Sequence, residues 1–551
     1  IAYKVNPDGS IDTINPAGKA WDTDQTGKIP MPGDRDIYTW NGTGTPLVKG
    51  VAFLWANLTA SQQTDLQDGG PVADGQDRLE WLRGNQSEEQ PGGVFRTRSR
   101  ILGDIVNSDP FYVAAPNFGY EVLPGTEGST YFAFRTGNLS RTKMLYVGTN
   151  DGMLHAFDAE TGVEKFAYIP NAVFPKLASL TAPNYAHQYF VDGSPYAGDA
   201  YFGGAWHTVL LGTTGAGGRA VFALDVTNPG SFAASKVLWE FTDPDLGYTI
   251  GQPVTGRMKD GTWAAIFGNG YESTSRRAFL YVVNLQTGAL IRKIDTGAGS
   301  VGAPNGLATP ALLADNSRII EYAYAGDLFG NLWKFDLTSA TPGNWKVAYD
   351  DGATPPNPAP LFKARYVSGS PSVEVAQPIT APLEIGLHPN GGYLIIFGTG
   401  KYFEVGDNGS TAVQSLYGVW DKGARIVETD RSTLVQQIIL AEPSVSGLTW
   451  RVVSKNPINW GSSLGWYVDL VTPPYPPGTV QGERVVSMPI LRSGRAIFTT
   501  LIPSLDPCAS GGTSWIMEVD MVTGGRLDYS VFDVNKDTQF SEADNVTVTG
   551  I

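Results

Sequence analysis

The sequence predicts an all-β protein, a modified β-propeller of about seven irregular four-stranded blades with long loop insertions. One observation is a phrase that occurs twice, at residues 146–158 and 324–336, each time as a strand, a tight glycine-containing turn and a second strand that ends on aspartate. The other is a short apolar strand, opened by proline, that recurs along the chain. Repetition of one supersecondary unit indicates stacked copies, and four antiparallel strands per unit is typical of a propeller blade.

The elements of the repeat follow one another in a fixed order. Proline opens the first strand, where a missing N–H costs no ladder bond, at Pro110, Pro195, Pro253, Pro310, Pro378 and Pro489. Second strands end on Gly148, Gly212, Gly268, Gly326 and Gly398, and residues 496–500 provide the sixth. Third strands end near Asp or Asn, with Thr-Gly turns after them at 161–162, 287–288 and 523–524. Fourth strands are expected at 165–168, 237–241, 289–293 and 345–349. Six units are counted in this way, and the sequence near the two ends is left for a seventh.

Three regions are predicted along the chain. Residues 1–100 form an N-terminal extension packed on the propeller, with helices at 60–67, capped by Thr59 or Ser61, and at 77–84, closed by Gly84. Residues 101–530 form the β-propeller. Residues 531–551 form an acidic calcium-loop segment that completes or flanks the last blade. Long insertions at 56–100, 159–190, 350–375 and 404–415 are expected to carry binding surfaces.

Composition excludes some classes of partner. The 551 residues carry a net charge of −15, which disfavours nucleic acid. No apolar run approaches the ~18 residues of a membrane span. Cys508 is the single cysteine, so its partner lies outside this piece or the thiol is free. The chain starts at Ile1 without Met, as expected of a mature product or a fragment.

Catalytic patterns are missing from the sequence, which predicts a protein that is not an enzyme. The four histidines are scattered, and no HExxH, nucleophile elbow, P-loop or dinucleotide fingerprint occurs. Residues 326–333 resemble the tryptophan-docking repeat of pyrroloquinoline quinone dehydrogenases, which pairs an Asp with a Trp. That pair occurs once, as Asp327 and Trp333, whereas the other copy has Thr149 and His155. A quinone-dependent dehydrogenase-like propeller enzyme is therefore kept as an alternative.

The strongest candidate site lies near the end of the sequence, and the ligand it predicts is Ca²⁺. Oxygen ligands at loop positions 1, 3, 5, 7, 9 and 12 can surround one calcium ion. The predicted ligands are Asp533, Asn535, Asp537, Gln539 (through its backbone carbonyl), Ser541 and Asp544. Thr538 replaces the glycine usual at position 6, and a solvated acidic turn is the alternative interpretation.

Five motifs in sequence order resemble one known family. They lie at residues 95–110, 147–157, 267–271, 324–336 and 397–403. The resemblance is to the C-terminal domain of PilY1/PilC-type proteins of type IV pili. The segments around Cys508 and Asp533 fit as well, so most of the chain is covered.

The resemblance implies a non-enzymatic pilus biogenesis factor and tip-associated adhesin with a roughly seven-bladed propeller. Such a protein supports pilus extension against retraction, twitching motility, surface attachment and virulence. It is secreted or at the cell surface, at the pilus tip, and outer-membrane associated or periplasmic in transit. Its partners are minor pilins and the pilus tip complex, with a host-cell surface receptor as a further partner. A generic propeller scaffold is the other alternative.

One departure from the family affects the expected calcium site. Relatives often bind calcium in an acidic loop just before the second copy of the repeated phrase. The matching positions here are Leu313, Asp315, Ser317, Ile319 and Glu321, and Leu313 cannot donate oxygen. Calcium is therefore expected at the Asp533 loop and not at residues 313–321.

Overall fold

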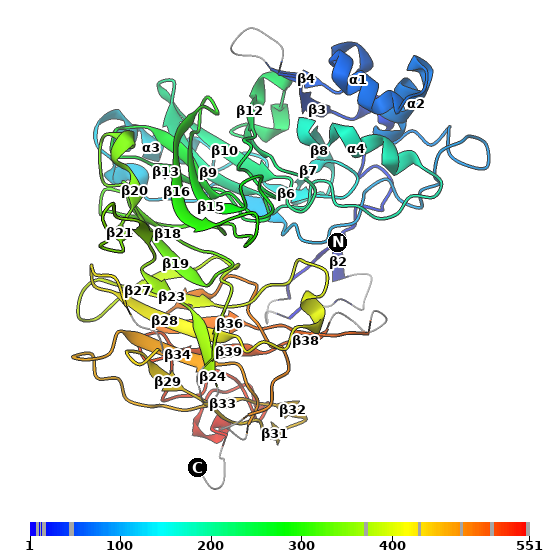
Figure 1. The fold of residues 1–551 in the computed structure, drawn as a ribbon. Helices are drawn as coiled ribbons and strands as arrows, with labels where there is room; N and C mark the ends of the chain where they lie inside the picture. The colour runs from blue at the N-terminus through cyan, green and yellow to red at the C-terminus, as the bar shows by residue number, and fades with distance from the viewer. Residues whose placement is uncertain are drawn as a thin grey trace.

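Six sheets of three to six strands form the body of the molecule. The structure is a computed structural model that describes residues 1–6, 10–11, 13, 18–42, 49–368, 373–427, 431–473, 478–506 and 512–546. Each sheet forms one blade, and the blades are numbered here in chain order. Figure 1 shows them following one another round an arc, from β6–β8 through β9–β16 to β36 and β39.

In each blade the strand that comes first in the chain is followed by strands that pair antiparallel in succession. Blade 1 contains β5 (Phe111–Val113), β6 (Met144–Gly148), β7 (Leu154–Asp158) and β8 (Glu164–Ile169). Blade 2 contains β9 (Tyr196–Phe202), β10 (Ala205–Thr213), β11 (Val221–Asp225) and β12 (Val237–Phe241). Blade 3 contains β13 (Val254–Arg257), β14 (Trp263–Gly268), β15 (Arg277–Asn284) and β16 (Leu290–Gly299).

The second half of the chain supplies the other three blades. Blade 4 contains β17 (Ala311–Ala314), β18 (Ile320–Gly326), β19 (Asn331–Asp336) and β20 (Lys346–Val347), and β23 (Phe362–Lys363) also pairs with β19. Blade 5 contains β26 (Glu384–Leu387), β27 (Tyr393–Gly398), β28 (Ser415–Asp421) and β34 (Gly465–Asp469), with β29 (Val435–Gln437) added in parallel. Blade 6 contains β35 (Ile490–Arg492), β36 (Arg495–Thr499) and β39 (Ile516–Asp520).

Short two-stranded hairpins lie between the strands of the blades. They are β21 (Tyr349–Asp350) with β22 (Pro358–Ala359), β24 (Arg365–Ser368) with β25 (Val373–Ala376), β30 (Ile439–Ala441) with β33 (Val452–Val453), β31 (Ser444–Val445) with β32 (Leu448–Thr449), and β37 (Ile502–Pro503) with β38 (Gly512–Thr513).

The repeat read from the sequence matches these blades closely. All six expected second strands are present, and proline directly precedes the first strand in five of six cases. Pro378 is the exception, because β26 begins only at Glu384. The intervening residues instead pack into the core, with Ile379 and Leu383 buried and the N–H of Ile379 bonded to the carbonyl of Asp327. Six blades agree with the six units counted, and the described part of the chain contains no seventh sheet of this kind.

The N-terminal residues extend blade 1. Here β3 (Ile37–Trp40) pairs in parallel with β8, and β4 (Gly50–Ala52) pairs with β3. A separate hairpin joins β1 (Ala2–Tyr3) to β2 (Lys19–Trp21). Figure 1 shows α1 (Ala60–Gln67) and α2 (Val72–Leu82) beside these strands. The assignment of 1–100, 101–530 and 531–551 as separate regions stays a prediction.

The first predicted helix is correct in detail, whereas the second was placed too late. Thr59 caps α1 in a capping box with Gln62. The second helix begins at Val72 and not at residue 77, because Pro71 precedes it as an extended N-cap residue. Two further helices were not expected, α3 (Gly125–Gly137) and the short α4 (Phe174–Leu177). No helix of the described residues is both long and apolar enough to cross a membrane.

One position of the repeat carries a buried polar side chain in every blade, just after the second strand. In blade 4 it is Asp327, whose carboxylate accepts from the ring N–H of Trp333 at 2.8 Å. In blade 3 it is Asn269, whose Oδ1 accepts from the N–H groups of Phe279 and Leu307. The full set is Thr149, Thr214, Asn269, Asp327, Thr399 and Thr500. Different residue types thus satisfy the same tight turn, which explains why the Asp–Trp pair appears once.

A tryptophan joins neighbouring blades at the Thr-Gly turns. Trp239 of blade 2 lies on Gly288 of blade 3, where an added Cβ would be 2.6 Å from its Cγ. Its Nε1 donates to the carbonyl of Leu285 at 2.8 Å. Gly288 has a φ of +72°, so the turn needs glycine for its backbone as well as for this contact.

The same contact occurs at two other turns. Trp466 of blade 5 lies on Gly524 of blade 6, and its Nε1 donates at 3.1 Å to the carbonyl three residues before that glycine. Trp21 of the N-terminal region lies on Gly162 of blade 1 and donates to Ala159 at 2.9 Å. The N-terminal residues therefore take, at blade 1, the place that a preceding blade takes elsewhere.

Candidate functional site

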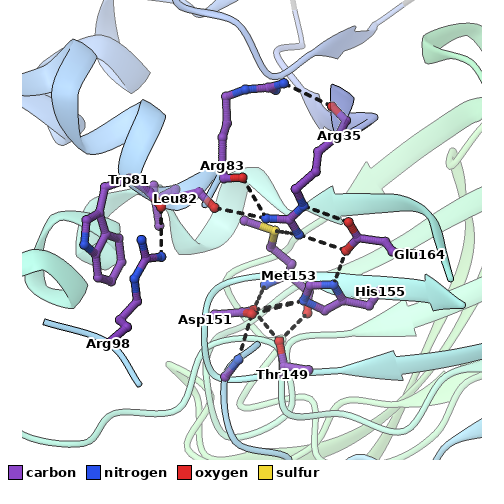
Figure 2. A network of polar contacts seen from close by, with 11 residues as sticks. Arg35, Trp81, Leu82, Arg83, Arg98, Thr149, Asp151, Met153, His155 and Glu164 are labelled. Carbon is purple, nitrogen blue, oxygen red and sulfur yellow. Dashed lines mark hydrogen bonds and ion pairs between the residues drawn. The ribbon is translucent and has the colours of Figure 1, made fainter. Parts of the chain in front are cut away.

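A buried polar network lies where the N-terminal region meets β7 and β8 of blade 1 (Figure 2). His155 on β7 is the centre of this network and has no exposed surface. Its Nδ1 lies 2.6 Å from Oε1 of Glu164, and its Nε2 lies 3.1 Å from Oδ2 of Asp151. Asp151 also accepts from the N–H of Gly103 at 2.9 Å and from the hydroxyl of Thr149.

The N-terminal region supplies the cation of this network. Arg35, immediately before β3, binds Glu164 with two nitrogens at 2.7 and 2.8 Å. Its remaining nitrogen donates to the carbonyl of Arg83 at 3.0 Å, at the end of α2. Both side chains of the Arg35–Glu164 pair are only 1% exposed. Arg35 therefore connects the extension, helix α2 and blade 1 through one guanidinium group.

Charges within the network stabilise one another. Burial disfavours the protonated ring of His155 and by itself would lower its pKa. The carboxylates of Asp151 and Glu164 outweigh this effect and raise the pKa of His155 to about 9. Burial likewise disfavours the ionised form of the two carboxyl groups, but the nearby cations outweigh it. His155 lowers the pKa of Asp151 to about 2, and Arg35 and His155 together lower the pKa of Glu164 to about 2. The network is thus two cations paired with two anions at neutral pH.

A cavity of about 430 Å³ lies beside the network, between the extension and blade 1. Arg98 lies 3.5 Å above the ring of Trp81, and Arg96 lies 4.6 Å above that of Tyr185. The wall includes Trp81, Arg96, Arg98, Arg100, Asp104 and Asp151. Because both signs of charge line it, the cavity favours neither anions nor cations.

The network is suited to holding parts together and not to proton transfer with a substrate. Both nitrogens of His155 are bonded to carboxylates, and the ring is completely buried. Sequence analysis counted His155 only among four scattered histidines. It missed Arg35 and Glu164, which lie 129 residues apart and carry no local signal.

The other histidines do not join this network. The Nε2 of His187 lies 2.8 Å from Asp104 at the surface, and His207 lies 3.1 Å from Asp225. His388 stacks on Trp420 with ring centres 4.1 Å apart. Within the described ranges, no group of three or more His, Cys, Asp or Glu side chains is arranged to hold a metal ion. Cys508 lies outside the described residues.

The predicted calcium loop forms a compact turn. Asp533 accepts from the N–H groups of Asp537 at 3.1 Å and Thr538 at 2.8 Å. Asn535 Oδ1 accepts from the N–H of Asp537 at 2.9 Å. Thr538 has a φ of +66°, the left-handed conformation that glycine normally supplies at this position.

The last predicted ligand is held by the backbone. Asp544 is 1% exposed, and its two oxygens accept N–H groups from Val534, Asn535 and Ser541 at 2.8 to 3.2 Å. These bonds lower the pKa of Asp544. Asp544 therefore closes the loop onto its first residues. The loop thus brings positions 1, 3, 5 and 12 into one turn, while calcium itself stays a prediction.

The degenerate loop at 313–321 is a β-hairpin turn between β17 and β18. Asp315 Oδ1 accepts from the N–H of Ser317 at 2.8 Å and from that of Ile319 at 2.9 Å. Ile319 is 8% exposed and packs into the core. The carboxylate of Asp315 thus holds the turn through the backbone.

Comparisons with known proteins agree with the architecture. A profile of the family described as "PilY1 beta-propeller domain" matches residues 102–445. The chain is 42% identical, over 534 residues, to the "Type IV pilus biogenesis factor PilY1" of Pseudomonas aeruginosa strain PAK, a match that covers 90% of this chain and 44% of that protein. It is also 42% identical, over 498 residues, to a "Type IV pilus biogenesis factor PilY1 homolog" of Xylella fastidiosa, covering 86% and 33%.

A solved structure extends this similarity to the fold. The crystal structure of the Pseudomonas aeruginosa PilY1 C-terminal domain matches with a TM-score of 0.64 and 37% identity, over 76% of this chain and 87% of that one. The chain spans less than half the length of the curated relatives it matches. The names of these relatives describe biogenesis factors and not enzymes. The predicted modified propeller and the family resemblance are both confirmed, and the chain belongs to the PilY1 β-propeller family.

Proposed function

We propose that this chain is the propeller part of a type IV pilus biogenesis factor that works without catalysis. The supporting observation is 42% identity to a named biogenesis factor over 90% of the chain. A rigid propeller presents its loops to partners at little entropic cost. Its partners in this proposal are the minor pilins of the pilus tip complex, at the cell surface.

The finer parts of the proposal concern what the tip complex does. The propeller acts as a tip-associated adhesin that binds a host-cell surface receptor, supports extension against retraction and permits twitching. Calcium orders the loop from Asp533 to Asp544 and so alters the affinity of the surface beside it. The spacing of oxygen ligands and the left-handed turn at Thr538 support calcium binding.

The experiment replaces the matching C-terminal region of Pseudomonas aeruginosa PilY1 with this chain in a strain that lacks its own gene. Sheared surface pili, twitching zones and attachment to cells are then measured. Restored pili are expected, and a stably exported chimaera that restores none contradicts the biogenesis role. Restored pili without attachment contradict only the adhesin role.

The two alternatives are separated by other measurements. Reconstitution with pyrroloquinoline quinone and a dye-linked alcohol assay is expected to give no turnover, whereas turnover would favour the dehydrogenase alternative. Co-purification of minor pilins with the chimaera distinguishes a pilus factor from a generic scaffold.

A further inference from the structure

Blade 6 differs from the other five blades in lacking a fourth strand among the described residues. In blades 1 to 5 the third strand is hydrogen-bonded on its outer side to β8, β12, β16, β20 or β34. In blade 6 the third strand, β39, pairs with β36 alone. Its outer edge therefore has no neighbouring strand in the described part of the chain.

The turn that should lead into a fourth strand is nevertheless present. Asp520 donates its N–H to Gly525 at 2.9 Å and accepts that of Gly524 at 2.8 Å. The equivalent turn in blade 3 has the same two bonds, and there the chain continues into β16. In blade 6 the chain turns away, and the N–H of Arg526 donates to Ser454 at 3.0 Å. The segment that could have filled the edge is thus bound elsewhere.

The free edge carries backbone donors that point outward. The N–H of Asp520 faces the turn, on the side away from β36, and donors alternate sides along a strand. The N–H groups of Glu518 and Ile516 therefore face the same way. Neither N–H group donates a hydrogen bond to another backbone carbonyl in the described part of the chain. Such an edge is a template for another strand.

The sheet face beside this edge carries three isoleucines together with the ion pair of Arg495 and Glu518 at 2.7 Å. Ile490 and Ile516 are 57% and 61% exposed, and Ile497 lies opposite Ile490 on the same face. Met517 and Val519 point to the other face, into the core shared with blade 5. At blade 1 the N-terminal region contacts the outward face through Trp21 and Arg35. On blade 6 Ile490 and Ile516 stay exposed in the described part of the chain.

We propose that the outer edge of β39 receives an extended strand from a partner protein, which completes blade 6 as its fourth strand. The strand needs apolar side chains at alternate positions, to continue the layer of Met517 and Val519. It carries lysine or arginine among the others, because the whole chain has a net charge of −15.

The molecule itself supplies a probe for this edge. A fluorescent peptide with the sequence of residues 289–296, Ala-Leu-Ile-Arg-Lys-Ile-Asp-Thr, is the fourth strand that follows the same turn in blade 3. Saturable binding to the whole chain is expected, with none for a scrambled peptide. Glu518→Pro removes one outward N–H and no ladder bond to β36, and should weaken binding at least ~10-fold. Glu518→Gln keeps that N–H and should bind as the parent does.

Hydrogen exchange tests the edge without relying on a variant. The amides of Ile516 and Glu518 should exchange fast in the free chain, those of Met517 and Val519 slowly, and the peptide should slow the first pair. Equal protection of all four in the free chain overturns the proposal, because the chain then closes its own edge. Absence of saturable binding, or binding that Glu518→Pro leaves unchanged, overturns it too. None of these readouts involves pili, so their failure leaves the biogenesis role intact.

Discussion

The indole of Trp21 lies on Gly162, and its Nε1 donates to the carbonyl of Ala159 at 2.9 Å. This relationship is the one that Trp239 has with Gly288 across the boundary between blades 2 and 3. The extension thus reproduces the contact of a blade without forming one. The N-terminal residues consequently cap the propeller at blade 1, whereas blade 6 has no fourth strand among the described residues.

The glycine of this contact gives the first prediction. Gly288→Ala should lower the free energy of unfolding by roughly 2–4 kcal/mol, because alanine resists a φ of +72° and its Cβ would meet Trp239. Urea unfolding measures the change. Gly352→Ala is the control, since Gly352 has a φ of +74° with nothing within 4 Å, and should cost about 1 kcal/mol. Equal losses in the two variants would show that the indole contact does not restrict this turn.

The second prediction concerns the attachment of the extension. Arg35→Leu should destabilise the chain by about 3–5 kcal/mol, because it leaves Glu164 buried beside a reduced positive charge. Limited proteolysis should then cut residues 49–100 faster. Arg100→Leu is the control, because Arg100 is 69% exposed in its pair with Asp24 and should change stability by less than about 1 kcal/mol. Similar proteolysis of the two variants would contradict the role of Arg35.

The third prediction is a pH dependence set by His155. Its pKa is raised from 6.5 to about 9 on folding, so its stabilising contribution is complete below pH 6.5 and is lost as pH rises through about 9. The pKa values of Asp151 and Glu164 are lowered to about 2, so their contribution is present above their unfolded pKa values and is lost as pH falls towards 2.

The measurement is the midpoint of thermal unfolding between pH 6 and 10. The free energy of unfolding of the parent should fall by on the order of 3 kcal/mol across this range as His155 loses its proton. His155→Gln should remove this part of the pH dependence. His187→Gln, at a surface histidine, serves as the control. A His155→Gln variant with the parent's full alkaline slope would assign the effect to other groups.

Local patterns account for what the sequence predicted well. A proline at a strand start, a Thr-Gly turn and the cap at Thr59 each depend on a few adjacent residues, so they are legible without the fold. The pairing of Arg35 with Glu164 is not, because it joins charges 129 residues apart. The missing fourth strand of blade 6 was equally hidden, since its turn at Thr523 and Gly524 matches the turns that do lead into one. Helix α3 contains three glycines and three threonines, which weakens its helical signal.

Calcium binding at the last loop is the fourth prediction. Calcium at 100-fold excess over Kd should raise the free energy of unfolding of the parent by up to about 2.7 kcal/mol, and the midpoint of thermal unfolding should rise with it. Asp533→Ala with Asp537→Ala should abolish that rise, because it removes the ligands at positions 1 and 5. Calorimetry of both chains gives the affinity directly. Asp528→Ala, at an acidic residue 84% exposed outside the loop, should bind as the parent does. Unchanged binding by the double variant would place calcium elsewhere.

The fifth prediction uses the strained position of the same loop. Thr538 holds a φ of +66°, which costs an L-residue roughly 1–2 kcal/mol and is least suited to a β-branched side chain. Thr538→Gly should therefore stabilise the loop's bound conformation and tighten calcium binding by about 5-fold in calorimetry. Thr538→Ala keeps the Cβ and removes only the branch, so its affinity should fall between the two. Weaker binding by the glycine variant would mean that the threonine side chain contributes to the site, because the backbone alone favours glycine there.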